Sequence, residues 1–152
     1  EPQLFHPGDL DYIHSVERIS KLSNVISING GVQLDLMGQE NAESTGTRQL
    51  SGVGGQMDFL EGAYRSKGGK GFICINSSRV TKDGERKSNI LATIPGGSTI
   101  SAPRTMIQYV ATEYGIASLS GKTLRERAEA MASIAHPDFR EELMKYAQEN
   151  FK

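Results

Sequence analysis

Ser51-Gly52-Val53-Gly54-Gly55-Gln56, followed directly by Met57-Asp58-Phe59-Leu60-Glu61-Gly62-Ala63-Tyr64, is the most informative stretch of this 152-residue chain. Three glycines in six residues let backbone N–H groups approach a ligand closely. The second segment is typical of a short helix, whose N-terminus adds a partial positive charge. The stretch therefore predicts a loop able to hold an oxyanion or a phosphate.

The glycine spacing by itself leaves the ligand open. Gly52-Val53-Gly54 begins a dinucleotide-binding fingerprint, but Met57 stands where the third glycine belongs. No Gly-Lys-Ser/Thr of a phosphate-binding P-loop follows. A plain glycine turn between a strand and a helix fits the same residues.

Strand patterns dominate the first two thirds of the chain. Residues 24–29 and 32–37 alternate and flank Gly30-Gly31, which predicts two strands joined as a hairpin. Further strands are expected at residues 71–76, 89–94, 99–102 and 106–112, separated by glycine- and proline-containing turns.

The last third is helical in pattern. Thr123-Leu124-Arg125-Glu126 is a capping box, and Leu124, Ala128, Met131 and Ala132 recur behind it at helical spacing, so a helix is expected to about Ala135. Pro137 suits the first turn of a second helix that presents Phe139, Leu143 and Tyr146 on one face.

Length and composition favour one cytoplasmic globular domain over residues 1–152. A formal charge of −1 with interleaved signs indicates neither nucleic acid nor a membrane surface as a partner. The single cysteine, Cys74, lies in the apolar run 71–75 and is expected to be buried. His6, His14 and His136 lack metal-ligand spacing, so no metal site is expected.

Two other segments are weaker ligand candidates. Lysines beside glycine turns at Ser66–Lys70 and at Lys82-Asp83-Gly84 suit phosphate contacts, although solvated loop lysines are commoner. Thr112-Glu113-Tyr114-Gly115 ends a predicted strand, where ligand-facing residues collect in open α/β sheets, but a structural carboxylate there is the commoner case.

Several segments together, and in one order, resemble acetyl-CoA hydrolase/transferase proteins. They are Gly38–Ser44, Ser51–Phe59, Ser66–Lys70, Thr112–Gly115, Gly121–Ala128 and Ala135–Arg140. The resemblance covers about residues 25–143 and looks nearest to 4-hydroxybutyrate and butyryl-CoA:acetate CoA-transferases. It implies an α/β fold of the NagB/RpiA/CoA-transferase type, with a mixed sheet, helices and only the C-terminal part present.

The resemblance also implies roles for individual residues. Coenzyme A or an acyl-CoA would be the substrate, exchanged with a short-chain carboxylate through a glutamyl-CoA thioester. Gly54 and Gly55 match an oxyanion loop and Glu113 an accessory acid. The positions that match CoA contacts are Ser51, Gly52, Gly55, Lys82 and Val32.

Two departures from the family pattern matter. The nucleophilic glutamate of the family lies upstream of the stretch matching Leu4–Pro7, so no catalytic nucleophile is expected in this chain. His14 stands where the family often has asparagine, and a surface histidine is expected there. A missing N-terminal part of the same protein is therefore an expected partner, and the full-length protein is expected to be a homo-oligomer. An acetyl-CoA hydrolase and a non-catalytic CoA-binding module remain as alternatives.

Overall fold

The computed structural model describes residue 4 and residues 7–152. Part of the stretch that resembles the family at Leu4–Pro7 therefore lies outside the described residues. Two short helices, α1 (Leu10–Ile13) and α2 (Val16–Lys21), come first, and α2 packs on α3 (Gln56–Arg65). Within the described residues, no helix is long and apolar enough to cross a bilayer.

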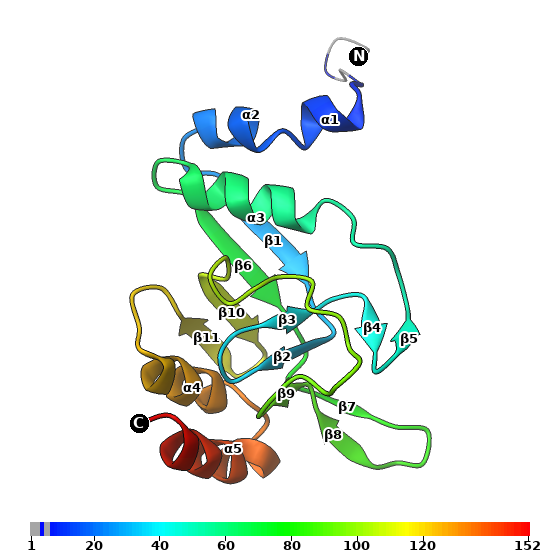
Figure 1. Cartoon of the computed structure of the whole chain (residues 1–152), viewed down its shortest axis with the longest axis vertical. Coiled ribbons are helices and arrows are strands. Elements are labelled where there is room, and N and C mark those ends of the chain that lie inside the picture. The colour runs from blue at the N-terminus through cyan, green and yellow to red at the C-terminus, as the bar shows by residue number, and fades with distance from the viewer. Residues whose placement is uncertain (1–3, 5–6) are drawn as a thin grey trace.

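The central sheet has four strands in the order β1-β6-β10-β11 (Figure 1). Its strands are β1 (Ile26–Gly30), β6 (Lys70–Cys74), β10 (Tyr109–Thr112) and β11 (Gly115–Ser118). The first three run parallel, and β11 returns antiparallel to β10. A sheet edge at which three parallel strands end together is thus formed by segments far apart in sequence.

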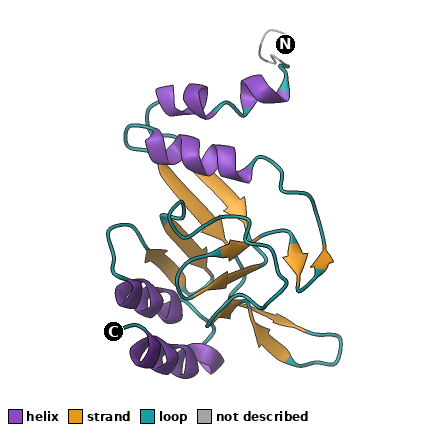
Figure 2. Ribbon diagram, viewed as in Figure 1, coloured by secondary structure: helices purple, strands orange, loops and turns teal. Residues whose placement is uncertain are grey.

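Smaller sheets surround this edge (Figure 2). One has the order β3-β2-β9, and two hairpins, β4-β5 and β7-β8, complete them. The bounds are β2 (Gln33–Asp35), β3 (Glu40–Asn41), β4 (Ser44–Thr45), β5 (Arg48–Gln49), β7 (Ser78–Val80), β8 (Arg86–Ser88) and β9 (Ile90–Leu91).

The predicted hairpin around Gly30-Gly31 is wrong. The strand β1 pairs with β6 over five residues, whereas β2 belongs to a different sheet. The packing around Gly31 explains why this residue is a glycine. A Cβ on Gly31 would lie 2.8 Å from the Glu40 carboxyl and 3.2 Å from Ile73. Gly31 therefore serves close packing rather than a tight turn. Of the other predicted strands, 99–102 is reduced to one bridge between Glu40 and Ala102, and 89–94 to β9.

The C-terminal helices are confirmed. The capping box at Thr123 forms, with Thr123 and Glu126 bonded in both directions, and begins α4 (Leu124–Ser133). Pro137 begins α5 (Pro137–Asn150), which packs on α4, and α4 in turn contacts β11. Ala128, Met131 and Ala132 are fully buried, whereas Leu124 stays 41% exposed.

One face of the central sheet carries the core. Ile73, Val110 and Ala117 lie opposite one another on neighbouring strands and are buried together with Leu60 of α3 and Met131 of α4. Residues on the opposite face stay open to solvent: Ile26, Ile28 and Ile116 are 51%, 68% and 63% exposed. The sheet is thus covered by helices on one face, while parallel sheets are normally covered on both.

Candidate functional site

The glycine loop, residues 51–55, connects β5 to the N-terminus of α3. Gly54 has φ +59°, and Gly55 follows with φ −98° and ψ 13°. A left-handed residue followed by a right-handed one turns successive N–H groups toward one point, a backbone nest that binds anions. The N–H groups of Gly54, Gly55 and Gln56 donate to no described residue. The loop is therefore an open set of donors at a positive helix end.

His14 lies against this loop, so the expectation of a surface histidine is wrong. Its side chain is 24% exposed, and its imidazole occupies the space where Gly55 would carry a Cβ. Its Nδ1 lies 3.4 Å from a carboxylate oxygen of Asp58, and its ring meets Phe59 edge-on at 5.1 Å. The packing of α2 on α3, which the local sequence does not encode, brings His14 to this position.

A cavity of about 450 Å³ opens at the carboxyl edge of β1, β6 and β10. Ligands of open α/β sheets bind at such edges. Val32 follows the lining residue Gly31 and is half-buried. The lining residues are Gly31, Cys74, Ile75, Asn76, Ala111, Thr112 and Glu113.

Cys74 is exposed in this cavity, so the prediction of a buried thiol is wrong. It ends β6, a strand in which alternate residues point to opposite faces, and only the face that carries Ile73 is covered. The apolar run around Cys74 did not reveal that one face of the sheet stays open.

Glu113 is held as an ionised carboxylate at the same edge. It accepts hydrogen bonds from the Ser77 N–H at 2.9 Å and the Ser77 hydroxyl at 2.6 Å. Burial acts to raise the pKa of Glu113, but these hydrogen bonds outweigh it, so the pKa lies below its ordinary value. Glu113 is thus a fixed, accessible negative charge beside the cavity.

Glu40 is a buried carboxyl that sequence reasoning did not assign to the site. It has no exposed surface and lies between Gly31 and Gln56, the first residue of α3. Burial raises the pKa of Glu40 to about 8, and the hydrogen bond from Gln56 acts in the opposite direction. The two-residue strand β3 that carries it has no alternating pattern, so no sequence signal marked its burial.

The lysine candidates lie away from the glycine loop. Lys82 is exposed in the turn of the β7-β8 hairpin, and within residues 7–152 no hydrogen bond or ion pair joins it to residues 51–55. Ser66–Lys70 follows the C-terminus of α3, about 15 Å along the ten-residue helix from the loop at its start. There the Ser66 hydroxyl donates to the Leu22 carbonyl and accepts from the Val25 N–H, which is a structural role.

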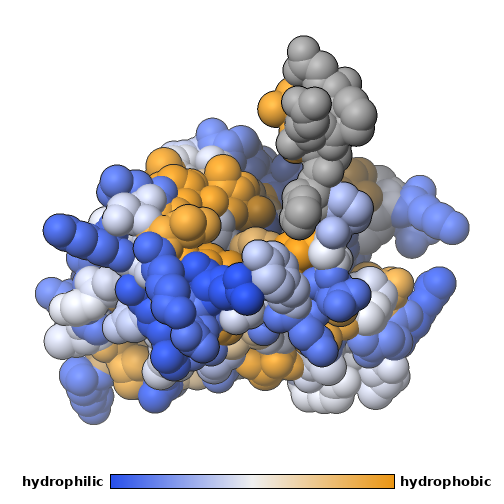
Figure 3. Space-filling model, turned by 90° about the horizontal axis from the view of Figure 1, so that it is seen from above, coloured by the Kyte–Doolittle hydropathy of each residue, from blue (hydrophilic) through white to orange (hydrophobic). Residues whose placement is uncertain are grey.

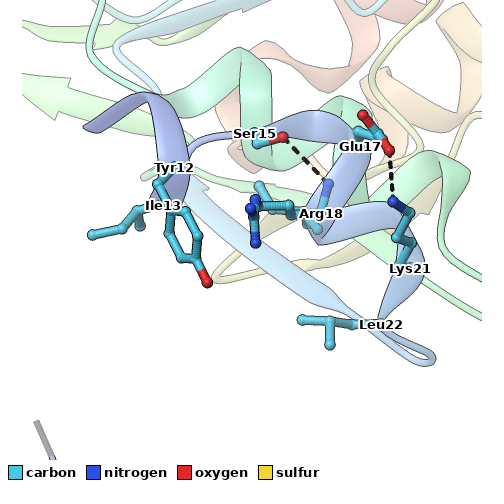
Figure 4. Close-up of a pocket in the computed structure, with 8 residues that line it drawn as sticks. Tyr12, Ile13, Ser15, Glu17, Arg18, Lys21 and Leu22 are labelled. Atoms are coloured by element: carbon cyan, nitrogen blue, oxygen red, sulfur yellow. Dashed lines mark hydrogen bonds and ion pairs between the residues drawn. The ribbon is translucent and has the colours of Figure 1, made fainter. Parts of the chain in front are cut away.

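A larger cavity, about 600 Å³, lies beside α1 and α2 and contains none of the predicted site residues (Figure 4). The Arg18 guanidinium lies 3.7 Å from the ring centre of Tyr12 across it. No cluster of three or more metal-binding side chains occurs in the part of the chain that the structure describes.

The fold is thus an α/β protein with an open glycine loop at the N-terminus of α3 and a cavity at the carboxyl edge of parallel strands. Residues 3–147 match the acetyl-CoA hydrolase/transferase C-terminal domain, and the chain belongs to this family. The family resemblance stated from the sequence is confirmed.

Several relatives with similar sequences are named CoA-transferases. The chain is 47% identical over 139 residues to a butyryl-CoA:acetate CoA-transferase of Anaerostipes caccae, covering 91% of this chain and 31% of the relative. It is 48% identical over 142 residues to a 4-hydroxybutyrate coenzyme A transferase of Clostridium kluyveri, covering 93% and 32%. Two relatives named acetyl-CoA hydrolases share 32% and 30% identity.

Solved structures support the predicted α/β CoA-transferase fold. RipA from Yersinia pestis superposes with a TM-score of 0.80 at 39% identity, covering 91% of this chain and 30% of RipA. The chain thus spans about a third of the length of the proteins it matches.

Proposed function

We propose that this chain is the C-terminal, CoA-binding part of a CoA-transferase that moves CoA between short-chain carboxylic acids such as acetate and butyrate or 4-hydroxybutyrate. The observation that carries the proposal is the nest at Gly54-Gly55, whose N–H groups have no described acceptor. When a carboxylate adds to a thioester, negative charge develops on the carbonyl oxygen, and donors fixed beforehand stabilise it.

The proposed reaction divides the work between two parts of one protein. A glutamate carboxylate from the upstream part attacks the acyl-CoA carbonyl and expels CoA thiolate, which leaves an acyl anhydride. The thiolate then attacks the glutamyl carbonyl and releases the acyl group as a carboxylate, which leaves a glutamyl-CoA thioester. An incoming carboxylate reverses both steps.

In this proposal, the residues of this chain bind the acyl-CoA and orient it for attack. Gly54 and Gly55 would donate to the oxyanion, and Ser51, Gly52 and Val32 would contact CoA. Glu113, ionised at the cavity edge, would repel the carboxylates and so direct their approach. Lys82 would contact only the end of CoA that lies away from the thioester, because this lysine is on the projecting β7-β8 hairpin (Figure 1).

The open face of the central sheet is the surface proposed to receive the upstream part. Ile26, Ile28 and Ile116 expose apolar area there, and β1 is an edge strand with unpaired backbone groups. Leu10, Ile13 and Leu22 add exposed apolar side chains at the end that carries α1 and α2, where Figure 3 shows apolar side chains gathered. The matched relatives continue over roughly two thirds of their length outside the matched region. Residues 1–152 would then be one part of a C-terminal domain, within a homo-oligomer.

Ile28→Asp tests this interface. In the isolated chain the variant is expected to cost less than about 0.5 kcal/mol, because Ile28 is 68% exposed. In the full-length protein, where the face would be covered, the same charge would cost about 2 kcal/mol or more in urea unfolding. Val80→Asp, at a 58% exposed position on the β7-β8 hairpin, is the control and should cost little in both. Equal costs for Ile28→Asp in both proteins would contradict the proposed interface.

The reaction itself is tested with the full-length protein and acyl-CoA, with and without acetate. We expect the acyl-CoA to be consumed only when acetate is present, with acetyl-CoA formed in equal amount. Thioester loss that is independent of acetate would show the hydrolase activity for which two relatives are named.

A further inference from the structure

The Glu40 side chain connects three segments around the nest. Its carboxyl oxygen Oε2 accepts a hydrogen bond from the side-chain amide of Gln56, which directly follows Gly55. Its other oxygen, Oε1, lies 2.8 Å from the position of a Cβ on Gly31, a residue that lines the cavity. The carboxyl of Glu40 thus contacts both the glycine loop side and the cavity side of the site.

The backbone fixes the position of Glu40. Its N–H donates to the Ala102 carbonyl at 3.0 Å, and its own carbonyl accepts from the Ser101 N–H at 2.8 Å. Leu34 on β2 pairs with it from the other side. Glu40 therefore has no freedom to carry its carboxyl out to solvent, and it is completely buried.

One oxygen of this carboxyl has no partner. Oε1 is buried and makes no hydrogen bond with any described residue. A buried carboxylate with one bare oxygen is costly, whereas a carboxylic acid needs fewer partners. With the Gln56 amide donating to Oε2, we assign the proton of the acid to Oε1. No charged side chain contributes to the pKa change of Glu40, which arises from burial and the Gln56 hydrogen bond.

We propose that Glu40, as a neutral acid, is a positioning residue of the thioester site, holding Gln56 and with it the first turn of α3 and the nest. This inference rests on the proposed function. Ionisation of Glu40 would put a negative charge behind donors that must attract an oxyanion and would leave that charge buried with one oxygen unpartnered. The site is therefore competent while Glu40 keeps its proton and fails when Glu40 loses it.

The pH dependence of stability and activity follows from the upward shift of the Glu40 pKa. The pKa of Glu40 in the folded protein is about 8, above its ordinary value of 4.5. The stability contributed by the neutral acid is therefore fully present below about pH 4.5 and is lost as the pH rises toward about 8. One unit above that pKa, about one tenth of the molecules keep the proton, so kcat/KM at pH 9 should be about tenfold below its plateau.

Glu40→Gln in the full-length protein is the decisive variant, because glutamine keeps the acceptor for Gln56 and cannot ionise. We expect the alkaline fall of kcat/KM to disappear in Glu40→Gln and to remain in Glu61→Gln, a control that removes a carboxylate from a later turn of α3. Melting temperature between pH 5 and pH 9, measured without substrate, should fall in wild type and much less in Glu40→Gln.

The pH profile of kcat/KM and the pH dependence of the melting temperature distinguish failure of the positioning role from failure of the proposed function. An unchanged alkaline fall of kcat/KM in Glu40→Gln would overturn the positioning role, even if the melting curves differ, because Glu40 would then be structural alone. Absence of CoA transfer by the wild-type protein at every pH would overturn the proposed function instead. If the difference in melting temperature between wild type and Glu40→Gln does not change with pH, the assignment of the proton to Glu40 is overturned.

Discussion

Gly55→Val is expected to lower CoA transfer by the full-length protein about 100-fold or more, because the valine side chain would block the oxyanion from the backbone N–H groups, with a loss of the order seen when an oxyanion donor is removed. Gly55 has φ −98°, which any residue adopts, so the substitution causes no backbone strain. A side chain at this position would instead collide with the His14 ring and fill the space beside the nest. Turnover is measured with butyryl-CoA and acetate, and melting temperature should change by only a few degrees.

Two further variants show which contact matters. Gly96→Val is the control, because Gly96 has open space around it and no left-handed φ. His14→Ala combined with Gly55→Val removes the collision with the ring and leaves the nest filled. If the double variant regains wild-type turnover, displacement of His14 explains the loss and the nest does not. Wild-type turnover in Gly55→Val itself would refute the oxyanion assignment.

Features encoded within a few residues were predictable from the sequence. The helix after the glycine loop, the capping box at Thr123 and the proline that begins α5 all depend on neighbours one to four positions away. The glycine loop was likewise recognised as a possible anion site from its composition, and its order among other segments resembling the family identified the fold.

Features that depend on distant contacts were not predictable. Glu40 is buried because β3, Gly31 and the start of α3 meet there, and Gly31, Glu40 and Gln56 lie 9 to 25 residues apart in sequence, beyond the reach of local patterns. The parallel pairing of β1 with β6 spans 44 residues at Ile26 and Lys70, whereas local alternation suggested a hairpin. Cys74 was wrongly predicted to be buried, because the sequence of an apolar strand does not reveal whether both of its faces are covered.

Arg127→Met is expected to destabilise the chain by about 3–5 kcal/mol, because three backbone carbonyls lose a charged donor and each such hydrogen bond contributes about 1.5 kcal/mol or more. Arg127 is 8% exposed and donates to three backbone carbonyls: Nε to Met37 at 2.8 Å, Nη1 to Leu119 at 2.7 Å and Nη2 to Arg104 at 2.8 Å. Burial lowers the pKa of its guanidinium, but the group stays protonated. Methionine fills a similar volume and leaves these carbonyls without donors. Urea unfolding measures the loss.

The Arg127→Met substitution should disturb the candidate site as well as lower the stability of the fold. Arg127 holds Met37, and Gly38 beside it has φ +84° and no room for a Cβ, which would lie 2.7 Å from the guanidinium. This loop leads directly into β3 and Glu40, so loosening it frees the carboxyl that supports the nest. Arg125→Met is the matched control on α4, because Arg125 makes only an exposed ion pair with Glu129 and should cost less than about 0.5 kcal/mol. If Arg127→Met stays within about 1 kcal/mol of wild type, the three carbonyls find other donors, and the loop before β3 does not depend on Arg127.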